Sequence, residues 1–179
     1  PEDDFIQHDD LPYCMGEFVW TGFDYLGEPT PYYTNWPSHS SLFGIVDLAG
    51  FPKDVYYMYK SEWTDEPVLH IFPHWNWKEG EPVDIWAYYN NADEVELYLN
   101  GKSLGVRQKT DSTYHVSWRV PFTPGTLRAV SRLGGKEVLV KEIHTAGEPA
   151  RLVLTPDRSV IQADGSDLSF VTVDVCDID

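Results

Sequence analysis

The sequence is poor in basic residues. It has 13 Lys and Arg against 29 Asp and Glu, which gives a formal net charge of −16. A surface this acidic repels the phosphates of nucleic acids and the headgroups of anionic lipids, so neither nucleic acid nor a membrane is an expected partner. A neutral glycan meets no such repulsion, and carbohydrate ligands therefore stay open.

Long apolar runs are also missing. No stretch approaches the roughly 18 consecutive apolar residues that a membrane-spanning helix needs. No basic segment followed by an apolar one opens the chain, so no signal peptide is visible. If the chain is a fragment, that absence says nothing about secretion.

Cysteine is scarce, with only Cys14 and Cys176 at opposite ends of the chain. A disulfide between them is one alternative, but their positions favour separate domains and two free thiols. His8 stands beside Asp9 and Asp10 and could contribute to a metal site, although such an acid-rich run is more typical of solvated surface. We expect no metal and no cofactor, and we expect residues 1–15 to be an acidic loop.

Aromatic residues, in contrast, are plentiful, at 15% of the chain. The most distinctive stretch begins at Gly16 and contains Phe18, Val19 and Trp20. These three residues form a short apolar run, which is typical of a strand buried on both faces. The chain then becomes polar and rich in Gly and Pro. A buried strand that ends in an aromatic residue and opens into such a loop is typical of the active face of a (β/α)8 barrel.

The full run of this stretch reads F-V-W-T-G-F-D-Y-L-G-E-P-T-P-Y. It resembles the eighth barrel strand and the following loop of glycoside hydrolase family 2 enzymes of the β-galactosidase type. Two later blocks, at residues 44–53 and 56–63, resemble the last barrel helix of that family and its lead-in. The resemblance implies that Trp20 forms one wall of the subsite for a galactose ring, because an indole suits the apolar face of a sugar. The alternative is that Trp20 only fills the barrel mouth.

No catalytic residue is expected in this chain. A retaining glycosidase needs two carboxylates about 5 Å apart across the scissile bond, and the resemblance implies that both lie on earlier barrel strands. Glu17 is at the start of the strand, where barrel residues serve stability rather than catalysis. Asp24 and Glu28 are loop acids without a partner at a diagnostic spacing. We therefore expect the isolated chain to be inactive.

The next segment, residues 53–63, is predicted to be an amphipathic helix with Pro52 near its first turn. Its apolar face, formed by Val55, Tyr56, Tyr59 and Trp63, would pack on the barrel. Without the barrel, residues 1–64 would expose that face together with unpaired strand edges. This predicts possible self-association, or docking on the rest of the chain.

Beyond residue 67 the apolar period changes to two, and about seven strands are expected over residues 67–146. Asn100 and Gly101 predict a type I′ hairpin. The segment V-E-L-Y-L-N-G-K-S-L-G resembles the immunoglobulin-like domain that follows the barrel in many β-galactosidases of Bacteroidetes type. Trp86 and Tyr88 share one face of a strand, and we expect both to fill the core. The predicted fold class is mainly β, an immunoglobulin-like sandwich preceded by the last strand and helix of a barrel.

Three parts follow from these patterns. They are a barrel remnant at 1–64, an immunoglobulin-like sandwich at 65–147 and the truncated start of a second immunoglobulin-like domain at 148–179. The first hypothesis is a piece of a β-galactosidase-like hydrolase that acts on a galactoside-type glycan, in the periplasm or outside a bacterial cell. The alternative is a non-catalytic carbohydrate-binding or adhesion module.

Several aromatic residues could serve either hypothesis. Trp75 and Trp77, near the junction with the barrel, could pack at an interface or offer a ligand surface, and the sequence leaves both open. In the long loop at 22–52, Tyr32, Tyr33, Trp36 and His39 are candidate rim residues of the catalytic face. Each of them fits plain packing equally well.

Overall fold

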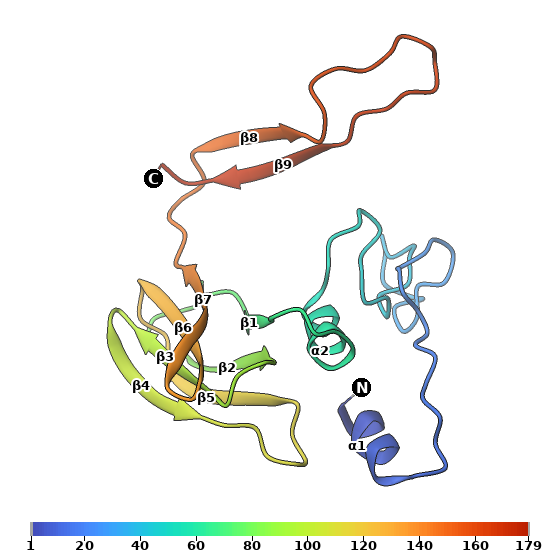
Figure 1. Ribbon diagram of the computed structural model, residues 1–179. Coiled ribbons are helices and arrows are strands. Elements are labelled where there is room, and N and C mark those ends of the chain that lie inside the picture. The colour runs from blue at the N-terminus through green and yellow to red at the C-terminus, as the bar shows by residue number, and fades with distance from the viewer. Residues whose placement is uncertain (1, 179) are drawn as a thin grey trace.

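A computed structural model describes residues 2–178, although nothing is described of the side chains of Asp9 and Asp10. The chain is laid out in three parts along its length: two short helices joined by a long irregular segment, a β-sandwich, and a separate hairpin (Figure 1). The helices are α1 (Glu2–Asp10) and α2 (Asp54–Trp63). The strands are β1 (Leu69–Phe72), β2 (Pro82–Tyr89), β3 (Glu94–Leu99), β4 (Lys102–Arg107), β5 (His115–Pro121), β6 (Thr126–Leu133), β7 (Lys136–His144), β8 (Arg151–Pro156) and β9 (Val171–Cys176).

The sandwich consists of two antiparallel sheets. One has the strand order β1-β2-β5 and the other β4-β3-β6-β7. The β3–β4 turn contains Asn100 and Gly101 with φ of 50° and 77°, which are the two positive values that a type I′ hairpin requires. The mainly β, immunoglobulin-like fold class predicted from the sequence is thus confirmed, as is this hairpin.

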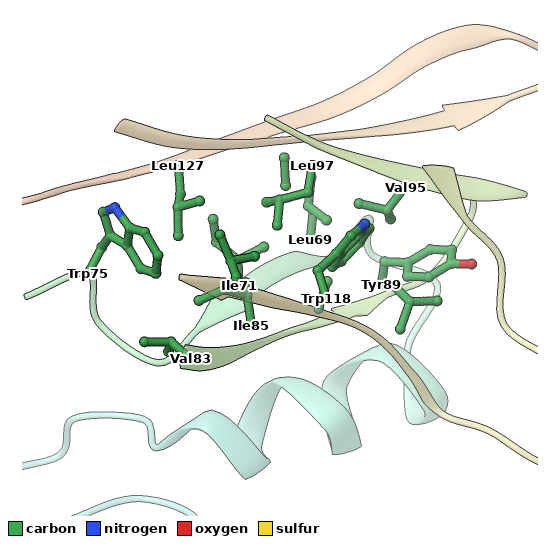
Figure 2. Packing of buried hydrophobic residues seen from close by; sticks show 14 of the residues in the cluster. Leu69, Ile71, Trp75, Val83, Ile85, Tyr89, Val95, Leu97, Trp118 and Leu127 are labelled. Atoms are coloured by element: carbon green, nitrogen blue, oxygen red, sulfur yellow. The ribbon is translucent and has the colours of Figure 1, made fainter. Parts of the chain in front are cut away.

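The core lies between the two sheets and is built by alternate residues of each strand (Figure 2). Two Trp residues contribute large buried side chains, and each finds a partner for its indole N–H. Trp118 donates to the carbonyl of Gly105 at 3.0 Å, and Trp75 donates to the carbonyl of Thr123 at 3.1 Å. The core therefore combines large apolar side chains with satisfied polar groups, as a stable interior requires.

The prediction that Trp86 and Tyr88 fill the sandwich core is wrong. On β2 the residues that point inward are Ile85, Ala87 and Tyr89, each at most 1% exposed. Trp86 and Tyr88 alternate with them and so lie on the opposite face of the sheet. That outer face is also apolar because the helices cover it. Only Asp84, near the start of β2, is polar and exposed on that face, so the apolar residues that follow it do not reveal the orientation of the strand.

Both helices contribute to a second apolar cluster on this outer face. Met58 and Tyr59 of α2 are buried there with Tyr88 of β2. Phe5 of α1 packs against Tyr59, with ring centroids 5.5 Å apart, and against Tyr114 at 5.3 Å. The face of α2 that was expected to pack on a barrel therefore coincides only partly with the face that is buried here. Trp63, at its end, is 54% exposed.

The expectation of a loop over residues 1–15 is wrong for its first part, where α1 forms. The acidic residues that suggested a solvated loop, Glu2, Asp3 and Asp4, occupy the first turn of the helix. Negative charge is favourable there because it faces the positive end of the helix dipole. Phe5, the next residue, packs into the apolar cluster and anchors the helix. The start of α1 therefore combines charged residues that suit the helix dipole with an apolar residue that is buried.

The connection between α2 and β1 is held by side chains from the β2–β3 turn. The amide of Asn90 donates to the carbonyls of Thr64 and Glu66 at 3.1 and 3.0 Å, and its oxygen accepts the N–H of Val68 at 2.8 Å. Asn91 donates to the carbonyl of Asp65 at 2.8 Å. The connection between α2 and β1 is therefore hydrogen-bonded along its length.

The predicted strand at Phe18, Val19 and Trp20 does not form among the described residues. Phe18 is fully exposed and Trp20 is 76% exposed. A strand exists only beside a partner that pairs its backbone groups, and pairing here starts one residue later. The carbonyls of Thr21 and Gly22 accept the N–H groups of Ile45 and Val46.

The β8–β9 hairpin stands apart from the sandwich (Figure 1) and has two unlike faces. One carries Leu152, Leu154, Val173 and Val175, which are 56–66% exposed. The other carries mostly polar residues, with Thr155 opposite Thr172. An amphipathic two-stranded sheet is half of a packed layer, and two strands cannot bury such a face by themselves.

No helix in the described part of the chain is long and apolar enough to cross a membrane. Cys14 and Cys176 are both free.

Candidate functional site

Trp20 lies at the point where the predicted barrel strand passes into the long loop. Its indole meets the ring of Tyr25 edge-on, with centroids 6.5 Å apart and planes at 86°. It borders a cavity of about 360 Å³ whose other walls include Phe43, Ile45 and Tyr59. The side chain is therefore an accessible aromatic surface beside a hollow.

An ion pair between a buried carboxylate and a half-buried ammonium fixes the base of the loop behind Trp20. The carboxylate of Asp24 lies 2.7 Å from the ammonium of Lys53 and accepts the N–H of Gly44 at 2.8 Å. Lys53 also donates to the carbonyl of Leu42 at 2.9 Å. Gly44 is required at its position, because a Cβ there would stand 2.2 Å from the backbone nitrogen of Asp24. Asp24 thus acts as a structural anchor.

Residues 28–38 form an excursion closed at its base. The N–H of Gly27 donates to the carbonyl of His39 at 2.9 Å, and the N–H of Tyr25 donates to the hydroxyl of Ser41 at 3.0 Å. Ser41 is completely buried. A loop whose ends meet in this way is an Ω-loop, a form that is often functional.

The rim candidates of this loop are displayed to solvent. Trp36 is 93% exposed, Tyr33 66% and Tyr32 42%. The ring nitrogen Nδ1 of His39 donates to the carbonyl of Pro37 at 2.7 Å, so His39 holds the loop together. The loop thus presents three aromatic side chains, while its one histidine is committed to the backbone.

The acids near Trp20 do not form a catalytic pair. Glu17 faces His8, with 3.4 Å between carboxylate oxygen and Nδ1, and Asp24 is committed to Lys53. Glu28 accepts the hydroxyl of Tyr25, and this hydrogen bond raises the pKa of that phenol. The expectation for His8 involves two side chains, those of Asp9 and Asp10, that lie outside the described set. In the described part no cluster of three His, Cys, Asp or Glu could hold a metal.

A second polar and aromatic group lies where the helices meet the outer face of the β1-β2-β5 sheet. His115 of β5 donates from Nδ1 to the carboxylate of Glu2 at 2.8 Å and stacks on Trp86, with centroids 3.8 Å apart. His70 of β1 pairs through Nε2 with Asp54 at 2.8 Å. A cavity of about 610 Å³ lies between these groups. No sequence pattern indicated this group, because its hydrogen-bonded pairs join residues that are far apart in the chain.

Burial shifts the pKa values of His70 and Tyr88 in this group. Desolvation lowers the pKa of His70, and the neighbouring Asp54 carboxylate offsets part of that effect. Desolvation, together with Glu2, raises the pKa of Tyr88 far above its usual range. Both side chains are therefore held in their neutral forms at neutral pH.

Trp75 and Trp77 have different surroundings. Trp75 is 1% exposed and meets Phe122 edge-on at 4.9 Å, so it belongs to the core. Trp77 is 38% exposed, stacks on His74 at 4.8 Å and donates its N–H to the carbonyl of the same residue. Neither indole offers an open face comparable to that of Trp20 or Trp36.

Comparison with known proteins points to carbohydrate-active enzymes. Residues 80–139 match a family described as "Domain of unknown function (DUF4982)". The chain is 63% identical over 168 residues to "Beta-galactosidase BoGH2A" of Bacteroides ovatus, an alignment that covers 94% of this chain and 20% of the relative. It is 43% identical over 149 residues to a "Putative beta-glucuronidase" of Formosa agariphila, with 80% of this chain and 14% of the relative covered.

Solved structures agree with this similarity. A β-glycosidase from Bacteroides vulgatus superposes with a TM-score of 0.87 at 35% identity, covering 99% of this chain and 22% of that one. A glycosyl hydrolase family 2 member from Bacteroides cellulosilyticus gives 0.84 at 31% identity, covering 99% and 27%. The chain thus spans about a fifth of the length of the proteins that it resembles.

Proposed function

Because the chain belongs to glycoside hydrolase family 2, as a segment that joins the end of the barrel to the accessory β-sandwich, we propose that it serves a β-galactosidase-type hydrolase. In this proposal Trp20 forms the wall of the subsite that receives the terminal sugar. The supporting observation is the accessible indole beside a cavity, held by a loop whose base is anchored through Asp24 and Lys53. The two catalytic carboxylates come from outside this segment.

Charge favours a neutral sugar over a uronic acid at this subsite. Residues 1–52 contain no Lys or Arg, and the first basic residue, Lys53, is already bound to Asp24 at 2.7 Å. A glucuronide carries a carboxylate that would need a cation or several N–H donors. Among the described residues up to Lys53, no Lys or Arg is therefore left unpaired for such a carboxylate. The 63% identity to a protein named as a β-galactosidase agrees with this choice.

In this proposal the sandwich supports α2, the last helix of the barrel, and keeps it in place. It holds α2 and α1 through His70 and His115, and it holds the connection through Asn90. We propose the division of the chain at 1–64, 65–147 and 148–179, with the last part continuing into another immunoglobulin-like domain. The binding-module alternative has less support, because Trp75 is buried and the rings of Trp77 and Trp86 are covered by histidines.

The proposed partner is a galactoside-type glycan, and the proposed location is the periplasm or exterior of a bacterial cell, in keeping with the Bacteroides relatives. The exposed barrel part of the isolated chain is proposed to self-associate. Neither proposal involves nucleic acid or a membrane.

The test is kinetic and uses the complete enzyme that contains this segment. It should hydrolyse 4-nitrophenyl β-galactoside and leave the β-glucuronide essentially unused. Trp20→Ala should lower kcat/KM. The loss should correspond to about 1–3 kcal/mol of transition-state stabilisation, the range for the loss of one aromatic and apolar contact. Unfolding should be unchanged, because the indole is exposed. A kinetically silent Trp20→Ala, or a preference for the glucuronide, would contradict the proposal.

A further inference from the structure

The Trp36 side chain is the most exposed indole in the chain. The other Trp side chains each contact a second aromatic ring or donate their N–H to a carbonyl, as Trp63 does with Tyr59 and Trp118 with Gly105. Trp36 is 93% exposed. Leaving so large an apolar surface in water is unfavourable, so an exposed indole on an ordered loop indicates a surface for a ligand or a partner.

The loop that carries Trp36 is held in one shape by short-range hydrogen bonds. The N–H of Asn35 donates to the carbonyl of Tyr32 at 3.0 Å, and the N–H of Ser38 donates to that of Asn35 at 2.7 Å. The hydroxyls of Thr30 and Tyr33 are bonded to each other. An aromatic side chain on such a loop can bind with little loss of conformational entropy.

The root of this loop lies beside Trp20. Gly27 and His39 close the loop, and Tyr25, two residues before Gly27, touches the indole of Trp20. The surface that bears Trp36 therefore extends outward from the proposed sugar subsite. If the terminal sugar of an oligosaccharide contacts Trp20, its other sugar units can reach this loop.

The chemistry of the loop selects the ligand. Residues 29–46 contain no Asp, Glu, Lys or Arg, in a chain of which 23% is charged. The exposed groups are aromatic rings together with the hydroxyl of Thr34 and the amide of Asn35. Stacking surfaces combined with neutral hydrogen-bonding groups suit a neutral polyol. Charged ligands find no ion-pair partner in this stretch.

We propose that Trp36 is a stacking platform for the leaving-group side of the substrate, where it binds a neutral sugar one or more residues beyond the terminal galactose. This inference rests on the proposed function. It makes the enzyme selective for the non-reducing end of a neutral oligosaccharide over a galactoside with a small leaving group. Trp20 then recognises the terminal sugar, and Trp36 recognises the chain attached to it.

The experiment compares two substrates in the complete enzyme. One is 4-nitrophenyl β-galactoside, and the other is a neutral oligosaccharide of three or more sugars that ends in β-galactose. Trp36→Ala should lower kcat/KM for the oligosaccharide roughly 10-fold, the loss expected for one sugar–aromatic stack. It should change the value for the nitrophenyl substrate less than about 2-fold, because that substrate ends before the platform. Trp77→Ala is the matched control and should leave both values unchanged.

Two further measurements keep the result decisive. Trp36→Phe retains a ring and should lose less than Trp36→Ala, which also covers the case in which the alanine variant folds poorly. The same oligosaccharide without its galactose should inhibit the unmodified enzyme and should inhibit Trp36→Ala more weakly. Equal losses on both substrates, or no loss on either, would overturn the platform and point to a contact with the rest of the protein. Failure of the unmodified enzyme to cleave any β-galactoside would instead overturn the proposed function.

Discussion

The Nδ1 atom of His115 lies 2.8 Å from a carboxylate oxygen of Glu2, which is 113 positions earlier in the chain. This hydrogen bond joins the first turn of α1 to β5, an edge strand of the β1-β2-β5 sheet. The ring of His115 also stacks on Trp86 at 3.8 Å, so one side chain makes a polar contact with the helix and an apolar one within the sheet. The contact between the helices and the sandwich is therefore specific in geometry as well as apolar.

Removing this hydrogen bond should loosen the N-terminal part. His115→Ala should lower the free energy of unfolding by about 1.5–3 kcal/mol, the range for a hydrogen bond to a charged group. A double-mutant cycle with Glu2→Gln should give a coupling energy of at least about 0.5 kcal/mol, because the two groups are in contact. Chemical denaturation followed by Trp fluorescence measures both. Arg119→Ala, on the same strand and in an exposed ion pair with Asp84, should cost less than about 1 kcal/mol. Additive effects of the two principal substitutions would contradict the assignment.

Acidification should weaken the same contact through His70. Its pKa is lowered from the ordinary 6.5 in the folded state, first by burial, with Asp54 acting in the opposite direction. Below pH 6.5 the unfolded chain therefore binds this proton more readily than the folded one, and the free energy of unfolding falls as the pH drops. This loss levels off once the pH passes below the folded-state pKa.

Unfolding measured between pH 8 and pH 5 should show this loss for the unmodified chain and a smaller one for His70→Gln. His144→Gln, at an exposed position on β7, serves as the control and should follow the unmodified chain. A pH dependence that is the same in all three proteins would show that His70 does not contribute.

The glycine at position 44 should be irreplaceable, unlike another in the same segment. A Cβ on Gly44 would lie 2.2 Å from the nitrogen of Asp24, whereas a Cβ on Gly22 would meet nothing within 4 Å. Gly44→Ala should therefore displace the pair of Asp24 and Lys53 and cost about 1–3 kcal/mol, as expected for overpacking a filled site. Gly22→Ala should stay within about 1 kcal/mol of the unmodified protein. In the complete enzyme, calorimetry together with turnover would test this, and an unperturbed Gly44→Ala would rule out the packing described here.

Association of the isolated chain should have two separable sources. Phe18 is fully exposed in the barrel part, and Leu154 is 61% exposed on the apolar face of the hairpin. Apolar surfaces next to unpaired strand edges promote association. Phe18→Asp and Leu154→Lys should each lower the mass measured by light scattering, and the double variant should lower it most. Thr155→Lys, on the polar face of the same hairpin, should not. A monomeric unmodified chain would contradict the proposal.

The sequence was informative wherever local pattern and local structure coincide. Asn100 and Gly101 specify a turn by backbone conformation alone, and the strands of the sandwich follow the period-two pattern. Strand β2 was misread because its outer residues, Trp86 and Tyr88, are as apolar as its inner ones, Ile85 and Ala87. Asp84 marks the outer face at the start of the strand, but beyond it that face is covered by α2, whose position depends on tertiary contacts.

The candidate site was predictable only in part. Trp20 was found through its family resemblance and stays a prediction, because its proposed partners lie outside this chain. The helix at Glu2 was missed because three acids in its first turn look like solvated surface when the helix dipole is ignored. The pairs of His70 with Asp54 and of His115 with Glu2 join residues far apart in sequence, and no spacing rule connects them.

The hydrogen bonds from Asn90 and Asn91 to the carbonyls of Thr64, Asp65 and Glu66 bear on how the protein that contains this chain could be divided or recombined. The two asparagines lie in the β2–β3 turn, yet they hold the residues that directly follow α2. If the gene were cut at this junction, the end of α2 would lose these hydrogen bonds. Asn90 and Asn91 in the β2–β3 turn would in turn lose the carbonyl groups that they bind. Chimaeras between relatives should therefore take α2, the segment that connects it to β1, and the β2–β3 turn from the same parent protein.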